Sequence, residues 1–70
     1  MKLSVEMGDV NSRDYGTVHA TGCRKMRDDM PMGEATTFAN ARALFLDSTG
    51  WELDDDEQPT YAPCARKGLR

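Results

Sequence analysis

Long apolar runs are missing from this chain of 70 residues. The longest is Ala43–Leu46, whereas a membrane-spanning helix needs about 20 consecutive apolar residues. Polar and apolar residues alternate over positions 2–7, where a secretory signal would hold an unbroken apolar stretch. We therefore expect no membrane partner and a cytoplasmic location.

A positive net charge is also missing. The formal net charge is −3, whereas a general nucleic-acid binder presents a basic surface to the phosphates. A nucleic-acid partner is therefore not expected of the molecule as a whole. The charge is unevenly spread, however. Acidic residues with no intervening base are Asp47, Glu52, Asp54, Asp55, Asp56 and Glu57, and the basic clusters are Arg24, Lys25 and Arg27, then Arg66, Lys67 and Arg70.

Catalytic motifs are the third absence. The chain has no phosphate-binding glycine-rich loop, no calcium-loop pattern and no Ser-His-Asp set. A chain of this length buries only about 60–65% of the surface of its unfolded form, so its core is too thin to enclose a pocket easily. We therefore predict a non-enzymatic protein, a single domain over residues 1–70, that acts by binding.

The residues that are present follow the pattern of a small α+β domain. Alternation over residues 2–7 predicts a half-buried strand, and residues 15–21 form a second extended segment. The two segments are close enough to pair as an antiparallel hairpin. The alternation puts His19 on the face opposite Val18 and Ala20, where we expect a surface side chain.

A helix is predicted from Thr36 or Thr37 to Ser48. Its apolar residues share neighbouring stripes, which is typical of a helix that covers a core. A threonine hydroxyl can cap the first turn, and Gly50 can adopt the left-handed conformation that ends a helix.

The segments around this helix are less regular. Residues 22–34 should be irregular because they hold Pro31 and several turn-forming residues. Residues 51–53 either begin a short strand or anchor the chain, residues 60–62 form an edge strand, and residues 66–70 should fray. The predicted fold is α+β, with an N-terminal hairpin plus one or two short C-terminal strands packed on one helix in ββαβ order.

His19, Cys23 and Cys64 form the one constellation with metal-binding chemistry. The pattern His-x3-Cys, then a helix, then Pro-Cys resembles a minimal zinc-binding module appended to some bacterial nucleases and DNA-repair proteins. That resemblance implies zinc as a cofactor, with these three side chains as ligands, because thiolate and imidazole suit a closed tetrahedral site. Lys67 stands where the module has its fourth ligand, a cysteine.

Two other interpretations of the cysteines stay open. Both can be buried as small apolar side chains, which is the common state of a free cysteine. Alternatively, a Cys23–Cys64 disulfide would close a long loop and stabilise so thin a core by about 4 kcal/mol in the chain-entropy model.

Candidate partner-binding residues come from two segments. Three methionines lie in the segment predicted to be irregular, where flexible thioethers either fill gaps in the core or form an adaptable contact surface. The acidic stretch and its neighbouring aromatic residues supply the others. The full set is Met26, Met30, Met32, Trp51, Glu52, Asp54, Asp55, Asp56, Glu57 and Tyr61.

The chain as a whole resembles small actinobacterial-phage proteins, which are very short and rich in Asp, Arg and Ala. The resemblance implies a protein that binds one protein of the bacterial host cytoplasm and modulates it. The alternative is a degenerate zinc-ribbon-like accessory module that contacts nucleic acid, which requires the basic clusters to converge on one face. Its contact residues would be Arg24, Lys25, Arg27, Arg66 and Lys67. Association into a homodimer is a third interpretation.

Overall fold

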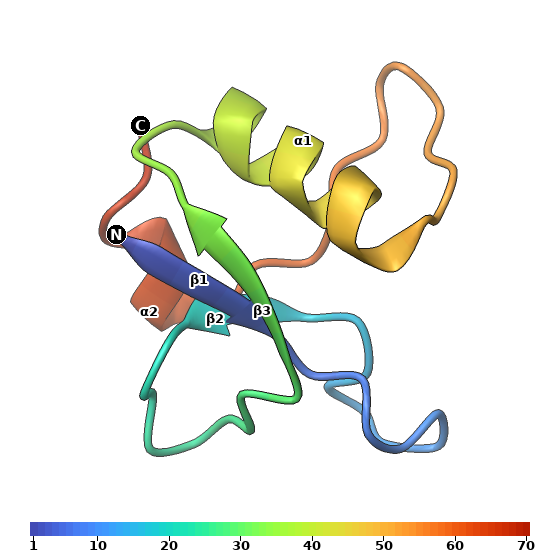
Figure 1. Cartoon of the computed structure of the whole chain (residues 1–70), viewed down its shortest axis with the longest axis vertical. Coiled ribbons are helices and arrows are strands. Elements are labelled where there is room, and N and C mark those ends of the chain that lie inside the picture. Colours follow the sequence, from blue (N-terminus) through green and yellow to red (C-terminus); the bar gives the residue numbers. More distant parts are fainter.

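The sheet is built around β1 (Lys2–Val5), which pairs antiparallel with β2 (Val18–Ala20) on one side and with β3 (Met30–Glu34) on the other. The computed structural model describes all residues from 1 to 70. Two helices complete it, α1 (Phe38–Thr49) and the short α2 (Pro63–Arg66) (Figure 1). The predicted α+β class and the predicted pairing of the first two strands are confirmed.

The core lies between the sheet and α1. In the register of β1 and β2, Leu3 is opposite Ala20 and Val5 is opposite Val18, so apolar side chains share one face. Helix α1 turns Ala41 and Phe45 toward this face. The buried apolar cluster consists of Leu3, Val5, Val18, Met32, Ala35, Ala41, Phe45, Ala65 and Leu69.

Helix α1 is capped as the sequence predicts. The Thr37 side chain accepts a hydrogen bond from the backbone N–H of Asn40 at 3.1 Å. Gly50 adopts a φ of 70° and donates its N–H to the carbonyl of Leu46 at 2.9 Å. These local signals fix both ends of the helix because each one satisfies a backbone group that the helix leaves without a partner.

Strand β3 corrects the prediction that residues 22–34 are irregular. Pro31 and Gly33 are tolerated because β3 is an edge strand, and a register shift opposite Leu3 and Ser4 absorbs the irregularity. The third strand of the sheet therefore precedes α1, and the predicted ββαβ order is wrong in this respect.

Residues 51–62 contribute no further full strand. Tyr61 makes a single parallel bridge to Val18, where the Val18 N–H donates to Thr60 and the Ala62 N–H donates to Val18, each at 2.8 Å. The expected edge strand is thus reduced to one bridge beside β2. Trp51 takes the anchoring role that was the alternative to a strand, because its ring packs on Phe45.

The predicted fraying of residues 66–70 is wrong. The Leu69 side chain is 7% exposed and belongs to the core. Arg70 donates its N–H to the carbonyl of Thr36 and accepts one from Phe38, both at 3.1 Å. The tail is held because it buries an apolar side chain and satisfies an N–H at the start of α1. Neither helix has the length and apolar character that crossing a membrane would need.

Candidate functional site

His19 is completely buried, which corrects its predicted surface position. It shares its sheet face with Ser4, and the segment that links β2 to β3 folds back onto that face. The Nδ1 atom lies 3.0 Å from the carbonyl oxygen of Ala20, and Nε2 lies 2.9 Å from that of Arg27. Asp28 places a carboxylate oxygen 3.6 Å from Nδ1. Since carbonyls only accept, the ring acts as a donor that ties the linking segment to β2.

The zinc ligand set implied by the sequence does not assemble in this arrangement. Each ring nitrogen of His19 faces a carbonyl oxygen about 3 Å away, which occupies the position that a metal ion would take. No three side chains among His, Cys, Asp and Glu are grouped in a way that could hold a metal ion. The residues present therefore do not fit a tetrahedral zinc site.

The two cysteines, by contrast, come together around Ala20. The Ala20 carbonyl accepts the N–H of Cys23 at 3.1 Å, and the Ala20 N–H donates to the sulfur of Cys64 at 3.4 Å. Both cysteines are free thiols and half-buried. The structure thus makes neighbours of two residues that lie far apart in the sequence.

The thiols open into a hollow of about 340 Å³ between the segment after β2 and helix α2. Hydrogen bonding from the backbone N–H of Lys25 is the main reason why the pKa of the Cys23 thiol lies below its ordinary value. The Cys64 thiol and the Lys25 ammonium group lower that pKa further. The side chains lining the hollow are Cys23, Arg24, Lys25, Met26, Ala62, Pro63, Cys64 and Lys67.

Apart from Asp47, which lies in α1, the residues of the acidic stretch lie on the loop between α1 and α2, here called the acidic loop (residues 51–58). Arg42 of α1 holds its backbone: Nε donates to the Glu57 carbonyl at 2.9 Å and Nη2 donates to the Asp54 carbonyl at 2.8 Å. The Glu57 carboxylate accepts the Asp54 N–H at 3.0 Å. The loop therefore has a fixed shape that does not depend on pairing its carboxylates with cations.

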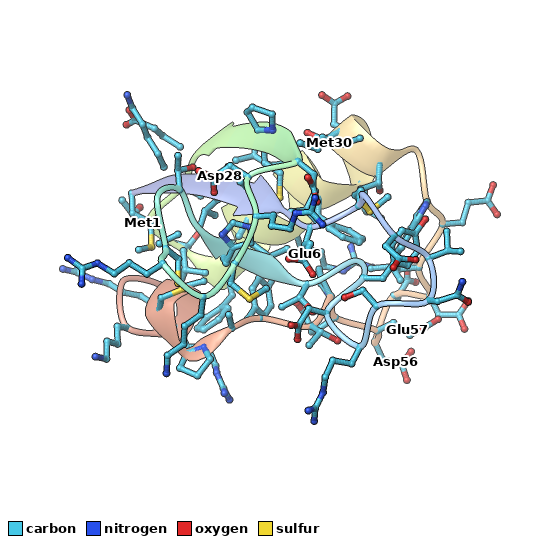
Figure 2. All side chains as sticks on the ribbon, turned by 90° about the horizontal axis from the view of Figure 1, so that it is seen from below. Met1, Glu6, Asp28, Met30, Asp56 and Glu57 are labelled. Atoms are coloured by element: carbon cyan, nitrogen blue, oxygen red, sulfur yellow. The ribbon has the colours of Figure 1, made fainter.

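The other carboxylates of the acidic loop point to solvent. Glu52, Asp54, Asp55 and Asp56 are all exposed, and none forms an ion pair; the one carboxylate within 4 Å of a basic side chain is that of Asp28, which lies beside His19. Figure 2 shows Asp56 and Glu57 at the end of the molecule away from α2. The same separation is visible in Figure 1, where the loop is orange and α2 is red.

The aromatic and methionine candidates divide by burial. Trp51 is 37% exposed and packs edge-on against Phe45, with ring centroids 5.4 Å apart. Tyr61 is half-buried against Phe38, and its hydroxyl has no hydrogen-bond partner. Met32 lies in the core and is removed from the candidate contact surface, while Met26 and Met30 are half-buried.

Two further carboxylates, those of Glu6 and Asp29, make contacts that the sequence does not indicate. Glu6 is 7% exposed and lies near the middle of the molecule (Figure 2). Its two oxygens accept the N–H of Arg27 and the hydroxyl of Ser12, both at 3.2 Å. Asp29 accepts the N–H of Gly8 at 3.0 Å. These contacts fasten loops to β1, so both residues are structural.

No family model, curated protein or solved structure matches this chain. The molecule has two surfaces suited to a function, the acidic loop and the hollow beside α2.

Proposed function

We propose that this chain is a non-enzymatic binding protein that docks the acidic loop on a basic surface of one partner protein. The observation that carries the proposal is the combination of a fixed loop backbone with unpaired side chains. Arg42 holds the carbonyls of Asp54 and Glu57, while the carboxylates of Asp55 and Asp56 are exposed and free of cations.

A loop of this kind suits recognition for two physical reasons. Its backbone is ordered before binding, so less conformational entropy is lost when a partner orders it further. Its carboxylates attract a complementary basic patch and raise the rate of encounter. The exposed edge of Trp51, which begins the loop, supplies the aromatic area that carries much of the binding energy in protein interfaces.

The partner that we propose is a cytoplasmic protein of a bacterial host, which the protein binds in order to modulate it. This choice is supported by the resemblance of the chain to small actinobacterial-phage proteins. A second copy of the chain is a weaker candidate for the acidic loop, because two such loops would repel each other.

The proposal is tested by affinity capture from bacterial lysate with a matched pair of variants. Asp55→Asn/Asp56→Asn removes two loop charges that make no internal hydrogen bond, whereas Asp14→Asn/Glu34→Gln removes two acidic charges elsewhere. We expect wild type and the Asp14/Glu34 variant to retain the same protein in near-stoichiometric amount, and the loop variant to lose it. Equal capture by both variants, or capture of nothing above background, would contradict the proposal.

Contact with nucleic acid is the second candidate function. It is favoured by one observation: Arg24 and Lys25 from one basic cluster and Lys67 from the other line the same hollow. This meets in part the requirement that the basic clusters converge. Treating the lysate with nuclease separates the two candidates, because a protein captured through the acidic loop is retained and one bridged by nucleic acid is lost.

A further inference from the structure

We propose that the hollow beside α2 is a thiol–disulfide exchange site at which Cys23 and Cys64 reduce an anionic disulfide of low molecular weight. This inference goes beyond the proposed binding function and uses a different surface. Helix α2, which lines the hollow, and the acidic loop lie at opposite ends of the molecule (Figure 1, Figure 2). Either activity can therefore fail without the other.

The geometry supplies a pair of thiols instead of a lone one. Ala20 holds both cysteines, the backbone of Cys23 through its carbonyl and the sulfur of Cys64 through its N–H. Both residues also line one open hollow. Two thiols at one opening can both meet a disulfide and then join to each other.

Cys23 is the thiol suited to attack first. Hydrogen bonding from the backbone N–H of Lys25 lowers the pKa of Cys23 and so favours the thiolate, which is the nucleophile in thiol–disulfide exchange. Cys64 accepts the N–H of Ala20 at 3.4 Å and lines the same hollow, so it is placed to resolve the mixed disulfide.

The charge of the hollow selects the substrate. Arg24 and Lys25 line it from the segment after β2, and Lys67 lines it from the end of α2, with no carboxylate among the lining residues. The nearest acidic group in sequence, Asp28, is engaged by the Gly22 N–H at 3.0 Å and by His19. Three cations around two thiols favour a disulfide that carries carboxylates.

The exchange proceeds in two balanced steps. The Cys23 thiolate attacks one sulfur of R–S–S–R, a Cys23–S–S–R bond forms, and R–S⁻ leaves and takes a proton from water. Cys64 then gives its proton to water and attacks the Cys23 sulfur, the Cys23–Cys64 disulfide forms, and the second R–S⁻ leaves. The protein loses two electrons, which the substrate takes up as two thiols.

The first test treats the full chain with oxidised glutathione and measures the intact mass. We expect a product lighter by two hydrogens and free of glutathione. Cys64→Ser should instead stop as a stable mixed disulfide on Cys23, and Cys23→Ser should react more slowly than Cys64→Ser. A wild-type product that carries glutathione on both cysteines would overturn the proposal that Cys23 and Cys64 act as a pair. Equal reactivity of the two single variants would overturn it as well.

The second test concerns charge selection. The rate with oxidised glutathione is compared with the rate with cystamine, a cationic disulfide, and each is divided by the rate of the urea-unfolded chain. At low salt we expect a preference of about tenfold for the anion in the folded protein, falling as salt screens the site. Lys25→Gln and Lys67→Gln should each reduce this preference, whereas Arg13→Gln, at the other end of β2, should not. A preference equal to one, or the same loss in all three variants, would overturn the assigned substrate class.

Discussion

Gly16 shows how closely one residue can control a surface side chain. Its φ is 80°, and a Cβ placed there would lie 2.8 and 2.9 Å from the Cη2 and Cζ3 atoms of Trp51. The absence of a side chain thus lets the indole ring approach the backbone of the turn before β2 closely. Trp51 is held in its half-exposed position by Gly16 on one side and by Phe45 on the other.

This arrangement predicts different outcomes for two glycine substitutions. Gly16→Ala should lower the free energy of unfolding by about 2–4 kcal/mol, because it adds a steric clash to the strain of a positive φ. Gly22→Ala is the matched control, since Gly22 has a φ of 83° but no atom within 4 Å of the added Cβ. It should lose only about 1–2 kcal/mol. Urea unfolding followed by Trp51 fluorescence measures both, and equal losses would show that the ring does not depend on Gly16.

Tyr61 gives a second prediction for a single residue, because its buried hydroxyl has no hydrogen-bond partner. Burial raises the pKa of Tyr61 in the folded state, so the folded protein favours the neutral phenol. This preference adds to the free energy of unfolding below a pH of about 10, the pKa of tyrosine in the unfolded chain. The contribution is lost as the pH rises above that value. Tyr61→Phe should therefore keep or gain up to about 1 kcal/mol at neutral pH. It should also lose less stability than wild type between about pH 8 and about pH 11. An identical alkaline loss in both proteins, measured by urea unfolding, would refute this assignment.

At the scale of elements, α1 has two roles. One face covers the core through Ala41 and Phe45, and Arg42 beside them holds the acidic loop by two hydrogen bonds to backbone carbonyls. The helix therefore fixes the loop that we propose as the docking surface. The Arg42 guanidinium is bonded to backbone carbonyls and does not pair with the carboxylates of Asp55 and Asp56. These carboxylates therefore remain available to a partner.

Arg42→Gln should loosen the acidic loop without changing its carboxylates. Amide hydrogen exchange should become faster at Asp54 and Glu57, and the affinity for the captured partner should fall by about 1 kcal/mol, the cost of ordering the freed segment. Arg13→Gln makes the same change of charge on the loop between β1 and β2 and serves as the control. If both variants bind equally well, the clamp has no part in recognition.

The sequence predicts those elements that local signals determine. Thr37 and Gly50 mark the ends of α1 because each caps the helix through its nearest neighbours. Strand β3 could not be predicted in the same way, since Pro31 is acceptable only because this strand lies at the sheet edge. Leu69 was likewise assigned to a fraying tail because only the folded chain provides the core that buries it.

The candidate site was predictable to a similar degree. The solvent exposure of Asp55 and Asp56 follows from their charge. The burial of His19 does not follow from strand alternation, because the segment after β2 covers the face that alternation assigns to solvent. The proximity of Cys23 and Cys64 depends on the bridge between Tyr61 and β2, which brings α2 beside Ala20.

At the scale of the whole molecule, charge is separated along a body of 26 × 23 × 17 Å. The acidic loop lies at one end, and α2 lies at the other (Figure 1), where it lines the basic hollow that holds the two cysteines. The two chain ends meet where β3 passes into α1: the Met1 ammonium group donates to Ala35 at 2.9 Å, and Arg70 is bonded to Thr36. These contacts close a small core and leave the two ends of the body free for separate roles.

Whether the acidic loop is the docking surface is tested most directly by the Kd of the purified complex with the captured partner, measured over a range of salt concentrations. We expect Asp55→Asn/Asp56→Asn to weaken binding at low salt and to flatten its salt dependence, because two screened charge contacts are removed. Asp14→Asn/Glu34→Gln should retain the Kd and the salt dependence of wild type. If the loop variant binds with the same Kd and the same salt dependence as wild type, the acidic loop is not the docking surface.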